Sequence, residues 1–456
     1  MLDKILSPIM SYTDWIWGWP ILILFAVAAF FYTISLKCFQ FTHFGFVMKN
    51  TLGKIFSKER LGEGTITPFQ AAASALASTL GTGNIAGVAV AVSLGGPGAI
   101  FWMWAVASLA LILKYAEITL AVKYREKRPG ETEYRGGFMY MLINACGSKW
   151  KWLAVIFAVF MAFEMALGPA VQSNAVASTV LHSFNIPVIA TGVVCAVLAA
   201  VVLIGGIKRI AQVADKVVPL MAVLYFAGAL VVIALHITAV PAAFVTIFSA
   251  AFGGAAAGGG FAGATVAMAI RHGLARGVCA HEAGMGTAPF AHSQAITDDP
   301  ARQGLWGIFE VFVSTFIVCT STGLVLVTTG ILETGVPGAS LVAQAFGTVF
   351  PGSSGDILVS VCLILFAFTT MIVNAYYGEK CFEFLVNPKY MNIYRLFVCG
   401  CILMGAVGGL RQVWGLMDTT MSVTVIINLL VVLALRKQVA EATTSFLEKM
   451  KREAKK

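Results

Sequence analysis

The feature that most constrains this chain is a succession of long apolar stretches, separated by short loops that hold nearly all of the charge. A helix needs about 20 mostly apolar residues to cross the hydrocarbon core of a bilayer. Hydrophobic residues make up 59% of the 456 residues and charged ones 12%, whereas a soluble domain carries roughly 25% charged residues. Such a surface is stable only where lipid covers it. The sequence therefore predicts an all-α, multi-pass protein of the inner or plasma membrane.

Eleven stretches are long and apolar enough to be spanning helices. They cover approximately residues 19–36, 67–94, 99–122, 152–181, 187–204, 217–237, 278–296, 305–329, 357–384, 394–408 and 415–435. The first exceeds the apolar core of a cleaved signal peptide, about 7–15 residues, and no small-x-small cleavage site follows it. We therefore expect it to be a retained helix.

The positions of Lys and Arg give the orientation of these helices. Most of the 31 basic residues fall in alternate loops and in the C-terminal tail. Cytoplasmic loops are enriched in Lys and Arg, so the N-terminus is predicted outside and the C-terminus inside. The outer segment at 238–270 is apolar and rich in Gly, which is compatible with interfacial or re-entrant helices. The tail after residue 437 is predicted to be a solvated, membrane-proximal amphipathic helix.

The last ten helices divide into two groups of five with opposite orientation, which is the pattern of an inverted repeat. The predicted organisation is an extra helix and cytoplasmic loop (1–65), a first repeat (66–237), an outer segment with a second repeat (238–436) and a cytoplasmic tail (437–456).

The first helix of each repeat has a centre that is unfavourable for a helix. Residues 74–87 read SALASTLGTGNIAG, and residues 281–289 read HEAGMGTAP. Each interior Gly costs about 1 kcal/mol relative to Ala, and freed backbone groups in lipid must bind something or line a cavity. Freed amides at a helix N-terminus suit a carboxylate, and freed carbonyls suit a small hard cation. Two such stretches at matching positions predict a site for an amino acid and Na⁺, with close helix packing as the alternative.

Several further polar residues lie inside apolar stretches. Thr369 and Thr370 offer two hydroxyls to a cation, although such side chains commonly bond their own helix. Gln172 and Asn174 add neutral polar groups. Ionisable residues within a membrane are functional candidates, and here they are Lys114, Glu117, Glu164, Glu282 and Glu310. We expect Lys114 and Glu117, three residues apart, to neutralise each other, and Glu164 and Glu282 to line a polar cavity.

Other classes of function lack their motifs. Asp298-Asp299 has no third Asp and Gly352-Ser353-Ser354-Gly355 has no later His, so we predict that the chain is not an enzyme. No phosphate-binding GxxxxGK[ST] occurs, so transport driven by ATP is not expected. The nine Cys residues form no CxxC pair and are read as small buried residues. The net charge of +9 lies in short loops, so no nucleic-acid partner is expected. A passive channel remains the alternative from a different class.

Five blocks of sequence carry a family resemblance. PFQA at 68–71 leads to GTGNIAGVA at 81–89, and these are followed by GGPGAIFWMW (95–104), EAGMGTAP (282–289), QGLWGIFE (303–310) and YYGEK (376–380). Together they resemble the alanine or glycine:cation symporter family. The resemblance implies a fold similar to that of the bacterial leucine transporter, and alternating-access symport of alanine or glycine with Na⁺, the transported coupling ion.

The resemblance also implies a site. The substrate would contact Thr82, Gly83, Asn84, Gln172, Cys279, His281, Gly284, Gly286 and Asn374. Na⁺ would contact carbonyls at Ser74, Ala75 and Ser78, together with Thr369 and Thr370.

Three positions depart from the family's pattern. Ala280-His281 replaces Ser-Asn, Val373-Asn374 replaces Gly-Trp, and Gly168-Pro169 replaces Gly-Asn. Loss of a Trp and gain of an amide predict a wider, more polar pocket, so a larger polar substrate such as glutamine is an alternative. His281 raises the alternatives of H⁺ coupling and of an ordinary hydrogen-bonded His.

Overall fold

The computed structural model describes residues 11–13, 15–55, 62–130, 133–253, 266–334, 338–386, 388–408 and 411–453. Within these residues the chain is helical, apart from loops and three isolated backbone bridges. The expectation of an all-α protein is confirmed. The Gly-rich centre of the predicted outer segment, residues 254–265, lies outside the described residues.

Seven described helices are long and apolar enough to cross a membrane. They are α7 (Gly98–Lys123), α9 (Lys151–Phe184), α11 (Gly206–Leu235), α15 to α16 (Pro300–Val311, the π-helical η5 Phe312–Cys319, and Thr320–Thr328), α18 (Ser354–Leu385), α19 (Met391–Val407) and α20 (Arg411–Ala434). Two shorter apolar helices join them, α2 (Trp19–Ser35) and α10 (Val188–Ile204). The chain is therefore a multi-pass membrane protein.

The remaining two spans are broken helices, as the sequence predicts. One consists of α5 (Pro68–Thr79) and α6 (Ala86–Gly95), and the other of α13 (Val266–His281) and α14 (Ala288–His292). The expected bounds of the second, 278–296, are wrong. The helix already includes Val266, and the charged Arg271 and Arg276 hide its outer part from a hydropathy count.

Local sequence explains where the key helices begin. Thr67 and Gln70 form a capping box at the start of α5, with reciprocal bonds of 3.2 and 3.1 Å, and Pro68 occupies the first turn. Asp299 caps α15 by accepting from the Ala301 amide at 2.9 Å. Both caps lie at the same end of the molecule, where they fix the inner ends of two helices that line the centre.

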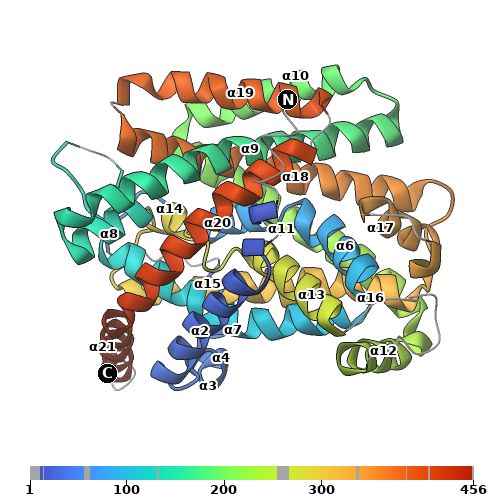
Figure 1. The fold of residues 1–456 in the computed structure, drawn as a ribbon, viewed down its shortest axis with the longest axis horizontal. Coiled ribbons are helices and arrows are strands. Elements are labelled where there is room, and N and C mark those ends of the chain that lie inside the picture. Colours follow the sequence, from blue (N-terminus) through green and yellow to red (C-terminus); the bar gives the residue numbers. More distant parts are fainter. Residues whose placement is uncertain are drawn as a thin grey trace.

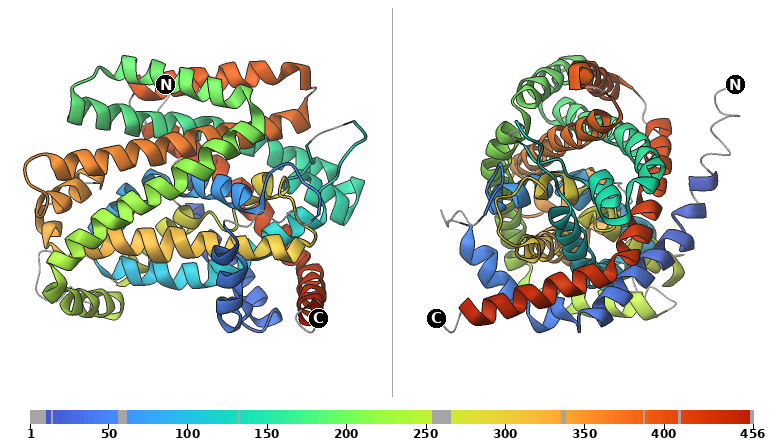
Figure 2. Two further views of the ribbon diagram at one scale, coloured as in Figure 1. Left: turned by 180° about the vertical axis from the view of Figure 1, so that it is seen from behind. Right: turned by 90° about the vertical axis from the view of Figure 1, so that its left-hand side faces the viewer.

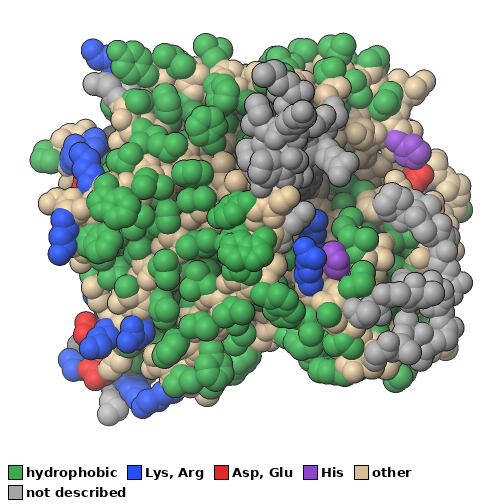
Figure 3. Space-filling model, viewed as in Figure 1, with side chains coloured by type: hydrophobic (Ala, Val, Ile, Leu, Met, Phe, Trp, Pro, Cys, Tyr) green, Lys and Arg blue, Asp and Glu red, His purple; other side chains and the backbone are tan. Residues whose placement is uncertain are grey.

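The long helices run side by side across Figure 1, with α8 (Phe138–Cys146) and α21 (Arg436–Glu453) at one end and α12 (Val240–Phe252) and α17 (Gly338–Gly347) at the other. Lys and Arg side chains gather at the end that holds α8 and α21, and the face between the ends is mainly hydrophobic (Figure 3). The exposed apolar side chains of α10 include Ile189, Val197 and Ile204. The basic end is the cytoplasmic one.

The C-terminal helix α21 is packed against the inner end and is not simply a solvated tail (Figure 2, right). It buries Val439, Thr443 and Phe446, because Thr443 bonds the Tyr115 hydroxyl at 2.8 Å and Lys449 pairs with Asp298 at 2.7 Å. Desolvation raises the pKa of Asp298, but Lys449 and Arg302 outweigh it and hold that pKa below its ordinary value. The carboxylate is therefore charged at neutral pH, and this pair holds α21 in place.

Close helix contact through Gly gives a first prediction. A Cβ on Gly405 of α19 would lie 2.2 Å from the Ala170 carbonyl of α9, whereas a Cβ on Gly400 of the same helix meets nothing within 4 Å. Gly405→Ala must push α19 away from α9, at a cost of about 2 kcal/mol. We expect thermal unfolding in detergent at a clearly lower temperature for Gly405→Ala, and no such change for Gly400→Ala. Equal unfolding temperatures would contradict this packing.

Candidate functional site

The break in the first broken helix frees backbone carbonyls at the centre of the molecule. In a continuous helix the Ala77 carbonyl would accept from the Gly81 amide. Instead Gly81 donates to the Thr79 carbonyl and to Asn84 Oδ1, both at 3.1 Å. Asn84 in turn donates its amide to Gly81, at 3.2 Å, so Leu80 also loses its usual donor. The break therefore leaves the Ala77 and Leu80 carbonyls for other partners.

One hydroxyl of α18, that of Thr370, meets these carbonyls. Thr370 Oγ1 lies 2.9 Å from the Ala77 carbonyl and 3.3 Å from that of Leu80. It also lies 2.9 Å from the Phe366 carbonyl, which Thr369 Oγ1 approaches at 3.0 Å. One hydroxyl proton satisfies only one of three acceptors. Thr370 Oγ1 and three carbonyls from α5, the break and α18 thus converge, and such uncharged oxygens suit a small hard cation. Thr369 Oγ1 lies beside the Phe366 carbonyl and also bonds the Leu365 carbonyl at 3.0 Å.

The carbonyls predicted to bind Na⁺, at Ser74, Ala75 and Ser78, belong to the same helix α5, and their role stays a prediction. Ser74 Oγ donates to the Gln70 carbonyl at 2.8 Å, and the Ala75 carbonyl accepts from Thr79 Oγ1 at 2.9 Å. Ser78 directs its hydroxyl toward Glu282 and Asn374. The carbonyls near Thr370 lie in the last turn before the break, because only there does the helix lose its own donors.

Helix α9 supplies the wall opposite the first break. A Cβ on Gly81 would lie 3.4 Å from Gln172 Nε2, so the Gln172 amide lies beside the break. Gln172 Oε1 is buried and has no hydrogen-bond partner within the described chain. One turn earlier, a Cβ on Gly168 would lie 3.1 Å from Asn374 Nδ2 of α18. Gln172, Asn374 and the first break therefore lie together, as predicted.

The second break presents a carboxylate to the first. Glu282 has a positive φ of 52°, uncommon for a residue with a side chain, and Gly284 and Gly286 also have positive φ. Its carboxylate accepts from Thr287 Oγ1 at 2.7 Å and lies 3.1 Å from Ser78 Oγ. Ser78 Oγ lies 2.7 Å from Asn374 Oδ1 as well. Acceptor oxygens therefore outnumber hydroxyl protons here too.

Other predicted residues lie away from this cluster. A Cβ on Gly284 would meet Leu429 and Phe25, and one on Gly286 would meet Phe157 and Asn428, so both glycines pack against surrounding helices. His281 lies against Phe25, with ring centroids 5.9 Å apart, and its Nδ1 accepts from the Ala283 amide at 3.1 Å. Its Nε2 is buried and has no hydrogen-bond partner among the described residues, so both expectations for His281 stay predictions. Cys279 is half-buried one turn before the second break.

Asn84 joins the first break to the π-helical segment η5. Its Nδ2 lies 3.3 Å from the Ala280 carbonyl, 3.4 Å from the Ser314 carbonyl and 3.3 Å from Cys319 Sγ. Thr322 Oγ1 donates to the Asn84 carbonyl at 3.0 Å. Asn84 is fully buried, so it holds the breaks in position and does not face an open cavity.

The buried ionisable residues pair differently from the sequence expectation. Lys114 and Glu117 do not form a pair, because their side chains reach different neighbours. Lys114 Nζ lies 3.2 Å from Glu310 Oε2, and Glu117 accepts from the Gly284 amide at 3.1 Å and from Asn428. Glu164 accepts from Thr424 of α20 at 2.9 Å. Glu117 and Glu164 thus anchor neighbouring helices.

An outer cavity of about 460 Å³ leads to the first break. Thr82 and Ala86 lie at one side, and the other walls come from α9, α17 and α18. Much of its lining is polar, including Asn174, Ser178, Thr179, His182, Ser183, Gln344, Asp356 and Ser360. The sequence reading missed most of these residues, although the α9 members recur every three or four residues and so mark one helical face.

The inner ends of both broken helices are tied together. Arg125 donates to the carbonyls of Ser293 (3.0 Å), Ala295 (2.6 Å) and Glu63 (2.7 Å). The Ile296 amide donates to the Ile66 carbonyl at 2.8 Å. These bonds join the segment before α5 to the segment after α14, so the path is closed at the inner end.

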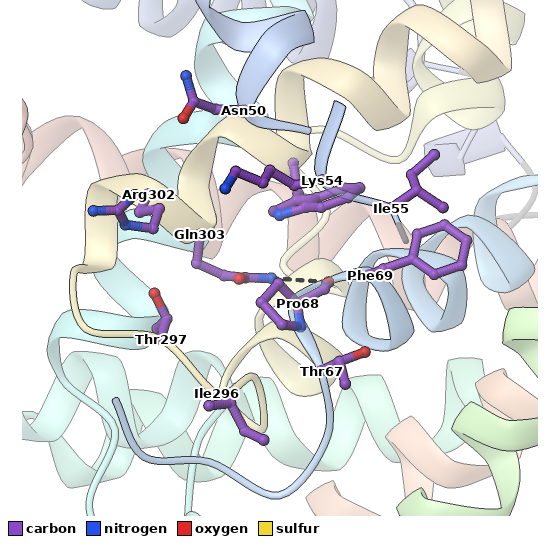
Figure 4. A pocket seen from close by; sticks show the side chains of 11 residues that line it. Asn50, Lys54, Ile55, Thr67, Pro68, Phe69, Ile296, Thr297, Arg302 and Gln303 are labelled. Carbon is purple, nitrogen blue, oxygen red and sulfur yellow. Dashed lines mark hydrogen bonds between the residues drawn. The ribbon is translucent and has the colours of Figure 1, made fainter. Parts of the chain in front are cut away.

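A small inner pocket of about 80 Å³ lies beside this closure, between the start of α5 and α15. Figure 4 shows Gln303 of α15 directed toward Pro68, whose carbonyl accepts from Gln303 Nε2 at 3.4 Å. The pocket is smaller than the outer cavity and borders the tied segments. It belongs to the closure and not to the central site.

Sequence comparison assigns almost the whole chain to one protein family. A sequence model of the sodium:alanine symporter family matches residues 3–456. The chain is 41% identical to the sodium/alanine symporter AgcS of Methanococcus maripaludis, over 98% of this chain and 99% of that protein. It is 33% identical to the probable sodium/glutamine symporter GlnT of Bacillus subtilis, over 99% of this chain and 92% of that protein.

Among solved structures, the fold is similar to that of an Eremococcus coleocola manganese transporter in complex with an aromatic bis-isothiourea substituted compound. The TM-score is 0.51 at 14% identity, over 83% of this chain and 80% of that one. A likeness at this identity concerns the fold alone. It supports the leucine-transporter-like arrangement of one extra helix followed by two inverted groups of five.

The anchoring role of Glu117 gives a second prediction. Glu117→Ala leaves the Gly284 amide and Asn428 without their acceptor, at a cost of about 2 kcal/mol. Glu117→Gln keeps one acceptor oxygen and should cost less. We expect the unfolding temperature in detergent to fall in the order wild type, Gln variant, Ala variant. Glu448→Ala, on the exposed face of α21, is the control and should have almost no effect.

Proposed function

The chain belongs to the sodium:alanine symporter family, and from that premise we propose that it imports a small neutral amino acid, alanine or glycine, together with Na⁺ by alternating access. The observation that carries the proposal is the convergence of freed carbonyls and hydroxyls at Thr370. A family of transporters also agrees with the absence of enzyme motifs in the sequence.

The proposed Na⁺ site consists of the carbonyls of Ala77, Leu80 and Phe366 and the hydroxyls of Thr369 and Thr370. Backbone carbonyls and hydroxyls are hard, uncharged ligands, so the ion brings the only net charge to this set. Na⁺ bound here would join the first break to α18 more strongly than the hydroxyl proton of Thr370 does. Ion binding would thereby favour the conformation in which the amino-acid site is formed.

The proposed amino-acid site lies next to the ion, at the base of the outer cavity. The carboxylate of the bound amino acid would face the backbone at Thr82 and Gly83. These residues precede the N-terminus of α6, where the helix dipole favours an anion. The ammonium group of the amino acid needs hydrogen-bond acceptors, and Gln172 Oε1 and the Glu282 carboxylate would provide them. This arrangement uses three of the residues expected from sequence and adds Glu282.

One end of the proposed path is open and the other is tied in this conformation. The cavity reaches Thr82 from the outer end, while Arg125 ties the inner ends of both broken helices. A closed inner end argues against the passive channel, which needs a continuous path. A potential of −100 mV contributes about 2.3 kcal/mol per inward charge, enough for roughly 50-fold accumulation.

Glutamine is the second candidate for the substrate. The names of the relatives, an alanine and a probable glutamine symporter, span both choices. Asn374, where the family resemblance leads one to expect Trp, places an amide beside Gly168. An amide in that place suits a polar side chain, and the absence of an indole leaves more room.

The ion site gives a third prediction. The double variant Thr369→Ala, Thr370→Ala removes both hydroxyl ligands, and each lost ligand is worth about 1 kcal/mol or more. The Na⁺ concentration for half-maximal uptake should rise about 10-fold or more, with a smaller effect on amino-acid affinity at saturating Na⁺.

Thr420→Ala is the matched control, because Thr420 of α20 bonds only carbonyls of its own helix among the described residues. An unchanged Na⁺ requirement in the double variant would place the cation elsewhere. Uptake driven equally well by an H⁺ gradient without Na⁺ would mean that H⁺ is the coupling ion.

The pocket gives a fourth prediction, tested by competition against labelled alanine. If Asn374 contacts a polar substrate side chain, unlabelled glutamine competes in the wild type, and Asn374→Ala weakens glutamine's competition several-fold more than that of unlabelled alanine. Competition by glycine and alanine but not by glutamine would exclude the larger substrate and leave the small neutral amino acids.

A further inference from the structure

Lys114 is a buried cation at the meeting point of the two helix breaks. It lies in the middle of α7, and its side chain is 0% exposed. Its Nζ lies 2.8 Å from the His281 carbonyl, 3.2 Å from Thr79 Oγ1 and 3.2 Å from Glu310 Oε2. Two of its donors form hydrogen bonds, to the His281 carbonyl and to Thr79 Oγ1, and Glu310 Oε2 lies at ion-pair distance. Lys114 is therefore surrounded by oxygens of three helices.

The position of these oxygens is informative. Thr79 is the last residue of α5 and His281 is the last residue of α13, so both belong to helix ends that point their C-termini at the centre. A helix C-terminus carries partial negative charge and favours a cation. Two such helix ends and the Glu310 carboxylate place oxygens around Lys114. Without the Lys114 ammonium, these oxygens would require a mobile cation.

Glu310 is held in place by a chain of hydrogen bonds leading away from the site. Its Oε1 lies 2.6 Å from His292 Nε2, and Gln303 Nε2 lies 2.8 Å from His292 Nδ1. All of these side chains are buried. The carboxylate is thus fixed toward Lys114 and cannot turn to follow a bound ion. The ion pair is therefore buried and held in one geometry.

We propose that Lys114 is a resident cation that takes the place of a second coupling ion at the helix breaks, so that one Na⁺ is carried with each amino acid. This inference rests on the proposed function and specifies its stoichiometry. The mobile ion binds on the α18 side of the first break, at Thr370. The Lys114 ammonium bonds the oxygens on the α13 side.

The direct test uses the wild-type protein in proteoliposomes, with ²²Na⁺ and labelled alanine measured in the same vesicles under an inward Na⁺ gradient. The expected flux ratio is one Na⁺ per alanine. A ratio of two overturns the inference and leaves Na⁺ symport intact. Alanine uptake that needs no Na⁺ contradicts the proposed function itself, and the inference with it.

A second test asks whether removal of the ammonium recreates an ion site. Lys114→Met leaves the Thr79, His281 and Glu310 oxygens without their cation, so the Hill coefficient for Na⁺ activation should rise from one toward two. Lys114→Arg keeps the charge and should stay at one. A purely structural Lys114 would change the amount of folded protein and leave the coefficient at one in the Met variant. If the Met variant does not fold, the wild-type flux ratio alone decides.

Discussion

The architecture depends on the rule that a backbone carbonyl within a membrane must find a partner. Most of the chain meets this rule with continuous helices, but α5–α6 and α13–α14 do not. Side chains of neighbouring helices bond the freed groups: a hydroxyl at the first break and an ammonium at the second. Thr370 meets the carbonyls of the first break, and Lys114 meets the end of the second. The proposed ion and amino-acid sites lie between Thr370 and Lys114.

The same rule explains how the site could be gated. Bonds at the inner end are mostly from side chain or backbone to backbone, as in the three carbonyls that Arg125 holds. Such bonds can be exchanged for water when the inner end opens, at small net cost. The Lys114–Glu310 pair, in contrast, is fully buried, and breaking it would leave two desolvated charges. The inner closure is therefore the part of the molecule suited to move, and the buried pair the part suited to stay fixed.

Much of this could be predicted from sequence, because membrane helices leave strong signals. The two breaks, the hydroxyl pair and Gln172 were each visible as polar or Gly-rich positions inside apolar runs. The particular carbonyls were not, since every residue has one, and their direction depends on where the helix loses its donors. That is why the carbonyls of Ala77 and Leu80 were not among the predicted residues. Residue spacing also suggested a Lys114–Glu117 pair, but partners on other helices decide where each side chain goes.

The measurement that tests the central claim most directly is uptake of labelled alanine into proteoliposomes of the purified protein, at fixed pH and potential, with and without an inward Na⁺ gradient. The account predicts accumulation above the external concentration only when the Na⁺ gradient is present. Equilibration without accumulation would indicate a facilitator, and accumulation that ignores Na⁺ would mean that the oxygens around Thr370 are not a coupling site.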